Sequence, residues 1–264
     1  MSFVENQGAK IYWDEQGSGE PLLLIMGLSY PSYMWHRSRP ILAKRFRTIA
    51  LDNRGVGQSD APPGIYSIAL MASDAAAVLH AAGIESAHVF GVSMGGMIAQ
   101  EFALQYPNRV RSLILGCTAA GGPHAVQAEP EALQALLRRD VTPEQAKEAI
   151  IPFIYDPATP RKLIDEDMAI RMKWYPTPQG YLGQLQGIFG WEAYSRIAQI
   201  AVPTLVIHGE TDRLVPAANA HLIAEKIPGA QLALLSHASH IFETDQPAAA
   251  QNAVLEFLIA QRGS

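Results

Sequence analysis

One short segment constrains the fold of this chain more than any other. Residues 87–92 have the apolar composition of a buried strand, residues 91–95 read Gly-Val-Ser-Met-Gly, and good helix formers follow as far as Gln100. Glycines two positions before and after Ser93 permit a turn too tight for a Cβ at either place. The segment therefore predicts a serine exposed between a strand and a helix, which favours a nucleophile over an ordinary glycine-rich turn.

The remainder of the chain alternates strand-like runs with helix-like segments. Continuous apolar runs are typical of strands buried on both faces, and strand-helix-strand order implies a parallel sheet. The expected strands are residues 3–4, 11–13, 22–25, 48–51, 87–92, 110–116, 204–207 and 231–235. The expected helices outside residues 121–199 are 41–46, 67–82, the segment after Ser93, 217–227 and 246–260.

Residues 121–199 interrupt this alternation. They contain no strand-like run of four residues, and prolines divide them into several short helices. We expect residues 1–120 and 200–264 to form the core and residues 121–199 to form a helical lid over a pocket. A helical insertion remote from any site is the alternative. The expected pocket residues are Tyr30, Trp35, Tyr155, Trp174, Trp191 and Ile241.

A serine hydroxyl needs a base to take its proton, and that base is usually a histidine oriented by a carboxylate. The acid should follow the strand at 204–207, where Glu210 and Asp212 are available. Asp212 is favoured because it lies deeper in the turn before the next helix. A capping or turn-forming aspartate is the alternative for this residue.

The histidine should come from the loop after the last strand, which contains His237 and His240. His240 is favoured because the small residues at 236–239 allow that loop to turn inward, although an exposed loop histidine remains the alternative. Two backbone N–H groups should stabilise the oxyanion. They are predicted to be those of Met94, directly after the serine, and Leu28, in the loop after the strand at 22–25.

The composition excludes several classes of function. The 264 residues carry a net charge of −5 without a run of lysines and arginines, so no nucleic-acid surface is expected. No stretch approaches the roughly 18 apolar residues of a membrane span. Cys117 is the single cysteine, which excludes an intramolecular disulfide and a multi-cysteine metal site. The first residues lack the pattern of a signal peptide, and we expect a cytoplasmic protein.

The chain resembles the α/β-hydrolase superfamily nearly end to end. The resemblance implies a mostly parallel eight-stranded sheet flanked by helices, with an inserted helical lid, and a triad of Ser93, Asp212 and His240. The segments that carry it are residues 26–28, 52–59, 91–96, 202–212 and 239–240, which read Met-Gly-Leu, Asp-Asn-Arg-Gly-Val-Gly-Gln-Ser, Gly-Val-Ser-Met-Gly-Gly, Val-Pro-Thr-Leu-Val-Ile-His-Gly-Glu-Thr-Asp and Ser-His.

Residues at a few positions indicate which branches of the superfamily this chain resembles. Ser93 argues against haloalkane dehalogenases and epoxide hydrolases, which have aspartate there. Residues 93–100 and 118–120 are similar to 3-oxoadipate enol-lactone hydrolases, and the whole chain also resembles small carboxylesterases. Ile241 stands where meta-cleavage-product C–C hydrolases usually have tryptophan, and Met26 stands where most relatives carry histidine.

These features predict a serine hydrolase of small or medium carboxylic esters or lactones, acting as a monomer or homodimer without a metal or organic cofactor. Enol-lactone or C–C bond hydrolysis and cofactor-free perhydrolysis are alternative reactions of the same triad. A ligand receptor built on the same fold is the alternative that is not an enzyme.

Overall fold

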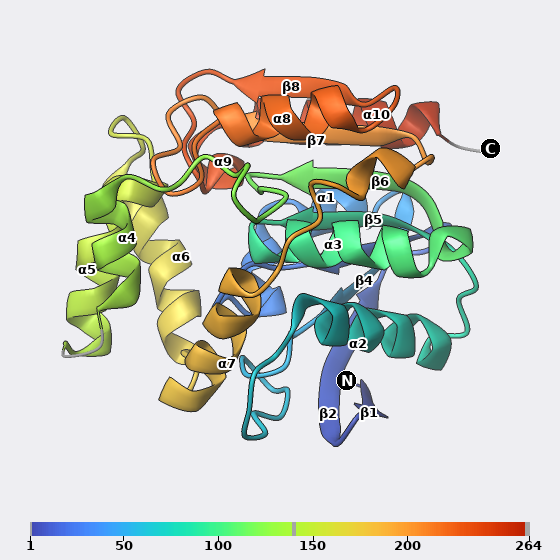
Figure 1. Cartoon of the computed structure of the whole chain (residues 1–264), viewed down its shortest axis with the longest axis horizontal. Helices are drawn as coiled ribbons and strands as arrows, with labels where there is room; N and C mark the ends of the chain where they lie inside the picture. The colour runs from blue at the N-terminus through green and yellow to red at the C-terminus, as the bar shows by residue number, and fades with distance from the viewer. Residues whose placement is uncertain (1, 139–140, 262–264) are drawn as a thin grey trace.

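The computed structural model describes residues 2–138 and 141–261, and Figure 1 shows a central sheet with helices on both sides. The described residues form a sheet of eight strands in the order β1-β2-β4-β3-β5-β6-β7-β8. The strands are β1 (Ser2–Asn6), β2 (Ala9–Gln16), β3 (Glu20–Ile25), β4 (Phe46–Leu51), β5 (Ala87–Val92), β6 (Val110–Gly116), β7 (Thr204–Gly209) and β8 (Gln231–Leu235). Only the β1–β2 and β2–β4 pairs are antiparallel, so the predicted mostly parallel sheet is confirmed.

Two hydrophobic clusters, one on each face, hold the helices against the sheet. Alternate residues of the central strands contribute to each cluster, as with Leu23 on one face and Leu24 on the other. The first face carries α2 (Ile68–Ala81), α3 (Met94–Gln105) and α8 (Ala218–Lys226). The second carries η1 (Ser32–His36), α1 (Arg39–Leu42), α9 (Phe242–Asp245) and α10 (Pro247–Ala260). Burial of both faces explains the unbroken apolar runs in the sequence.

A group of helices is inserted between β6 and β7. It comprises α4 (Pro130–Leu137), α5 (Pro143–Ile154), α6 (Arg161–Lys173), α7 (Pro178–Phe189) and the short η3 (Ile197–Gln199). Residues of α4, α5 and α6 form a third hydrophobic cluster, against which Leu214 and Ile241 of the core also pack. In Figure 1, α4, α5 and α6 lie beside the edge of the sheet toward which the arrowheads of β6 and β8 point. The insertion therefore adjoins the carboxyl ends of the parallel strands.

One predicted helix is wrong in its extent. The sequence predicts a helix over residues 41–46, but α1 covers only Arg39–Leu42 and Phe46 is the first residue of β4. Phe46 pairs with Glu20 of β3, and its fully buried ring contacts His88 edge to face. Residues 43–45 form the turn that this pairing requires. Among the described helices, none is both long and apolar enough to cross a membrane.

Candidate active site

The turn between β5 and α3 holds Ser93 in a strained backbone conformation, with φ 56° and ψ −122°. Two hydrogen bonds fix it: the Ser93 N–H donates to the Gly116 carbonyl at 2.8 Å, and the Thr118 hydroxyl donates to the Ser93 carbonyl at 2.7 Å. A Cβ on Gly91 would collide with the Gly95 carbonyl. Such strain persists only where surrounding contacts over-determine it, which makes this turn a candidate functional feature.

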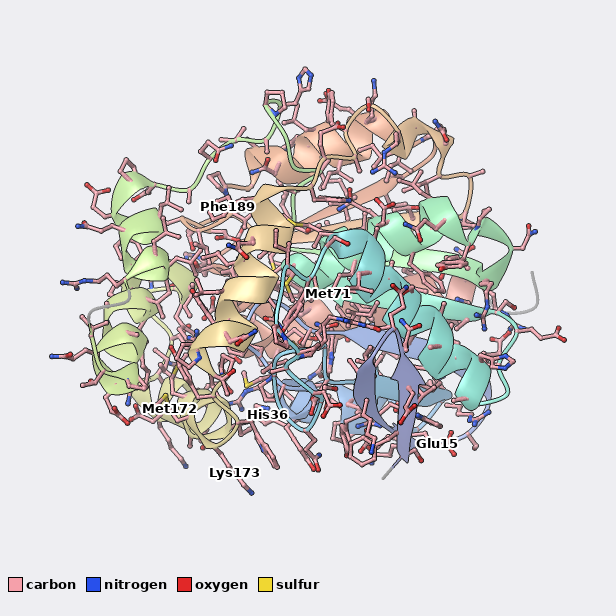
Figure 2. The ribbon with its side chains drawn as sticks, turned by 60° about the horizontal axis from the view of Figure 1, so that its bottom comes forward. Glu15, His36, Met71, Met172, Lys173 and Phe189 are labelled. Atoms are coloured by element: carbon pink, nitrogen blue, oxygen red, sulfur yellow. The ribbon has the colours of Figure 1, made fainter. Side chains whose placement is uncertain are left out.

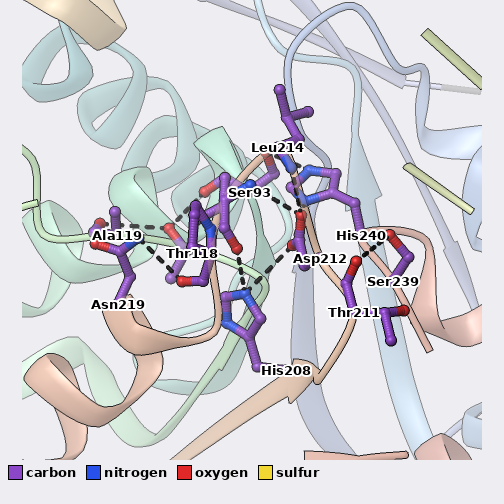
Figure 3. A network of polar contacts seen from close by, with 12 residues as sticks. Ser93, Thr118, Ala119, His208, Thr211, Asp212, Leu214, Asn219, Ser239 and His240 are labelled. Atoms are coloured by element: carbon purple, nitrogen blue, oxygen red, sulfur yellow. Dashed lines mark hydrogen bonds and ion pairs between the residues drawn. The ribbon is translucent and has the colours of Figure 1, made fainter. Parts of the chain in front are cut away.

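Ser93, His240 and Asp212 form a continuous chain of polar contacts, drawn in Figure 3. His240 Nε2 lies 3.0 Å from Ser93 Oγ, and His240 Nδ1 lies 2.7 Å from Asp212 Oδ2. An ionised carboxylate can only accept a hydrogen bond, so Nδ1 carries the ring proton of the neutral imidazole. Nε2 is therefore the free acceptor facing the serine hydroxyl, as a general base requires.

Asp212 is fully enclosed and held by several donors. Its Oδ1 accepts hydrogen bonds from the backbone N–H groups of Leu214 at 2.9 Å and Val215 at 2.8 Å. His208 Nε2 lies 3.2 Å from Asp212 Oδ2 and 2.7 Å from the Val215 carbonyl oxygen. Burial works to raise the pKa of Asp212, but His240 and His208 outweigh it and lower that pKa below its ordinary value. The carboxyl is thus held in its ionised form.

The same interaction acts in the opposite direction on His240. Burial works to lower the pKa of the imidazole, but the charge of Asp212 outweighs burial and raises the pKa well above its ordinary value. Contact with Cys117 acts in the same direction. Hydrogen bonds of the two neighbouring residues hold the backbone at His240 and so position its ring. The Ile241 N–H donates to the Ile154 carbonyl at 2.8 Å, and the Ser239 N–H donates to Asp245 Oδ2 at 2.7 Å.

The residues not favoured by the sequence lie elsewhere. His237 and Glu210 are both exposed, and the Glu210 N–H donates to the Leu235 carbonyl. The three favoured side chains, from β5–α3, the loop after β7 and the loop after β8, are the ones that meet.

Leu28 and Met94, the predicted oxyanion donors, line the same cavity as Ser93. Within the described residues, the Leu28 N–H makes no hydrogen bond. Met94 is the first residue of α3, where a helix leaves its N–H groups without partners in the helix. A Cβ on Gly27 would lie 2.9 Å from the Ser93 Cβ, so the loop after β3 closely approaches the serine.

Side chains from three other segments hold this loop, which begins at Met26. Asn53 Nδ2 donates to the Met26 carbonyl at 2.8 Å. The Ser29 N–H donates to Gln184 Oε1 at 2.9 Å, and Gln184 Nε2 donates to the Arg54 carbonyl at 2.8 Å. Arg171 Nη2 donates to Ser29 Oγ at 2.9 Å. Two of these supports, Gln184 and Arg171, come from the inserted helices.

A cavity of about 370 Å³ opens beside Ser93, between the carboxyl edge of the sheet and the inserted helices. Its wall is mainly apolar, and its ionisable residues include Arg37, Arg171 and Glu243 besides His240. Burial raises the pKa of Glu243 to about 7. Phe189, which Figure 2 shows at the surface on α7, lines the cavity while 59% exposed and so marks its opening.

Three of the six predicted pocket residues, Tyr30, Trp191 and Ile241, line this cavity. The other three do not line it, because each side chain packs against other residues. Trp35 is fully buried against Phe90, with 4.8 Å between ring centroids. The buried Tyr155 donates its hydroxyl to Asp167 Oδ2 at 3.1 Å. Trp174 stacks on Tyr33, with 5.6 Å between ring centroids.

Three residues that contact the site were missed in the sequence. The sequence does offer a signal for His208, since it lies near the end of β7, four positions before Asp212 in the loop that follows this strand. Gln184 and Arg171 lie 155 and 142 residues from Ser29 in the chain. No local pattern indicates a contact across such a separation.

The chain matches known proteins over nearly its whole length. Residues 20–151 match the family model described as alpha/beta hydrolase fold. An Azorhizobium caulinodans protein named provisionally as a carbamate hydrolase is 33% identical, covering 94% of each chain. A poly(3-hydroxyalkanoate) depolymerase of Ectopseudomonas oleovorans is 32% identical, covering 92% of this chain and 85% of the relative. The crystal structure of an enol-lactonase from Burkholderia xenovorans superposes with a TM-score of 0.88 at 25% identity, covering 98% of this chain and 100% of that one.

Proposed function

The chain belongs to the α/β-hydrolase family and is a hydrolase of that fold, and from this premise we propose that it cleaves carboxylic esters and lactones through Ser93, His240 and Asp212. The observation that carries this proposal is the unbroken contact from Ser93 Oγ to His240 and on to Asp212 at the wall of the cavity. This arrangement activates a serine for acyl transfer.

In the proposed mechanism, Ser93 Oγ attacks the substrate carbonyl carbon while its proton passes to His240 Nε2. Asp212 stabilises the imidazolium that forms, and the N–H groups of Leu28 and Met94 stabilise the negative charge on the carbonyl oxygen. The C–O bond to the leaving group then breaks, and His240 gives its proton to the departing alkoxide. Water repeats the sequence on the acyl-enzyme, with His240 as base, and releases the acid and free Ser93.

Two further observations support esters and lactones. The mainly apolar cavity has the size of a site for small ligands. Relatives are named for carbamates, poly(3-hydroxyalkanoates) and an enol-lactone, and each of these compound classes contains an acyl carbonyl group. In this proposal residues 121–199 act as the lid that completes the cavity and selects the acyl group.

The test is the hydrolysis of p-nitrophenyl butyrate by the wild type and by Ser93→Ala. We expect kcat to fall by at least about a thousandfold, because the nucleophile is lost. Ser18→Ala is the matched control, since Ser18 is exposed and does not line the cavity. Equal rates for the wild type and Ser93→Ala would refute the proposal, and comparison of ester, enol-lactone and dienoate substrates would separate the alternative reactions.

A further inference from the structure

Arg171 is a buried cation at the wall of the candidate active site. It lies on α6 and is 6% exposed. It lines the cavity beside Ser93 and also a neighbouring cavity of about 280 Å³ that lies among α4, α5 and α7. Its charge is therefore available to a molecule in the catalytic cavity.

The contacts of Arg171 are with neutral groups. Nη2 donates to Ser29 Oγ at 2.9 Å, and Nη1 lies 3.4 Å from the Tyr30 hydroxyl. The guanidinium also stands over the ring of Tyr30, 4.6 Å from its centroid, and 5.9 Å from that of Tyr175. Nε is buried and has no hydrogen-bond partner in the described part of the chain.

The acidic residue that precedes Arg171 most closely on α6 is already engaged. Asp167 is one turn before Arg171 on α6, but its Oδ1 accepts from Arg37 at 2.9 Å and its Oδ2 accepts from Thr244 at 2.6 Å. Among residues 2–138 and 141–261, no carboxylate lies within the 4.0 Å of an ion pair with Arg171. Arg54, which is 2% exposed, shows the contrast, because it pairs with Asp74 at 2.6 Å.

An unpaired buried charge is costly, and pairing it with an opposite charge repays much of that cost. We propose that Arg171, with the hydroxyl groups of Ser29 and Tyr30, forms a subsite for a carboxylate of the substrate that is separate from the carbonyl attacked by Ser93. A guanidinium whose Nε–H has no partner suits this role, since it can bind a carboxylate through charge-assisted hydrogen bonds.

The place of this subsite narrows the substrate class. Ser29, which Arg171 contacts, directly follows Leu28, the proposed oxyanion donor. The substrate carboxylate therefore lies a short distance from the scissile carbonyl. This inference rests on the proposed function and deepens it: the substrates are monoesters or lactones of short dicarboxylic or oxo-dicarboxylic acids.

The experiment compares kcat/KM for the monomethyl esters of succinate, glutarate and adipate with those for uncharged methyl esters of matched length. The wild type should prefer at least one charged ester. In Arg171→Gln the ratio of charged to uncharged kcat/KM should fall by at least about 30-fold, mainly through KM, because a buried charge pair is lost. Arg171→Lys should recover part of the preference.

Arg161→Gln is the matched control, because Arg161 lies at the start of the same helix, is exposed and loses the same charge. It should leave the ratio unchanged. No charged-ester preference in the wild type, or an equal fall for charged and uncharged esters in Arg171→Gln, would overturn the proposal. The second result would show that Arg171 only positions the loop at 26–30.

Measuring the binding of dicarboxylates tests the subsite independently of the proposed hydrolase activity. Glutarate and succinate should bind to Ser93→Ala in calorimetry, and adding Arg171→Gln should abolish the binding. If the wild type hydrolyses no ester while dicarboxylates still bind through Arg171, the hydrolase proposal fails and the subsite stands. If the dicarboxylates do not bind to Ser93→Ala, the subsite proposal is wrong.

Discussion

Asp212 connects the backbone of its own loop to the ring of His240, and its charge controls when that ring can act as a base. Two backbone N–H groups and His208 hold its carboxylate, and the remaining contact is to His240 Nδ1. The carboxylate raises the pKa of His240. Only the neutral imidazole accepts the serine proton, so activity should fall as the pH drops through that pKa.

This reasoning gives a prediction for pH dependence. In Asp212→Asn the raising influence is removed, so the pKa of His240 falls and the acid limb of the kcat/KM profile moves to lower pH. The plateau rate should also fall by about 10⁴-fold, because the imidazole loses its orienting partner. Glu210→Gln, an exposed neighbour, should change neither quantity. An acid limb that stays in place or moves to higher pH in Asp212→Asn would contradict this role.

Gln184 offers a second test at the residue scale. It is fully buried and joins the Ser29 N–H to the Arg54 carbonyl. Gln184→Met would leave both groups buried without partners, which should lower the free energy of unfolding by about 2–4 kcal/mol. It should also lower kcat, because Ser29 adjoins the proposed oxyanion donor. Urea unfolding and ester kinetics measure the two effects.

The control for Gln184→Met is Gln186→Met, an exposed position on the same helix. It should change stability by no more than about 0.5 kcal/mol. If both variants were equally stable, the contacts of Gln184 would not support the loop.

At the scale of elements, the sequence was most informative where periodicity and turn chemistry agree. The strand at 110–116 and the elbow at Ser93 were predicted because a buried parallel strand and a G-x-S-x-G turn leave strong local signals. The prediction of a helix at 41–46 is wrong because the burial of Phe46 in the sheet outweighs the helical pattern of the local sequence. Local preference is weak where tertiary pairing competes with it.

The elbow glycines give a prediction at this scale. A Cβ on Gly95 would collide with the carbonyl groups of Ile25 and Met26, at the end of β3. Gly95→Ala should therefore lower the free energy of unfolding by about 1–3 kcal/mol and displace the loop that carries Leu28. Gly190→Ala is the control, since Gly190 is exposed and meets only the Gln186 carbonyl, at 3.2 Å. A Gly95→Ala protein with wild-type stability and kcat would show that the approach is not tight.

At the scale of the whole molecule, the inserted helices are joined to the core by buried polar contacts. Trp191 Nε1 donates to Glu101 Oε2 at 2.8 Å, and Arg196 Nη2 donates to the same oxygen at 2.8 Å. Gln184 adds a connection from the middle of α7. The insertion should therefore unfold together with the core, in one calorimetric transition whose van't Hoff and calorimetric enthalpies agree.

Glu101→Gln should lower the temperature of that single transition, whereas two separate transitions in the wild type would show that the insertion is an independent unit.

The pocket is the feature of the whole molecule that the sequence predicts least well. The sequence predicts Trp35 and Trp174 in it because their segments are rich in aromatic residues, but it does not show which neighbours bury them. The unpaired charge of Arg171 also becomes visible only once distant segments are placed together.

The most direct test of the proposed chemistry is to label the protein with one equivalent of a fluorophosphonate and to map the adduct by peptide mass spectrometry. A single adduct on Ser93, ester hydrolysis that falls in proportion to labelling, and no adduct in His240→Ala are expected. Complete labelling that leaves hydrolysis intact, or an adduct on another residue such as Cys117 with Ser93 unmodified, would contradict a nucleophilic Ser93.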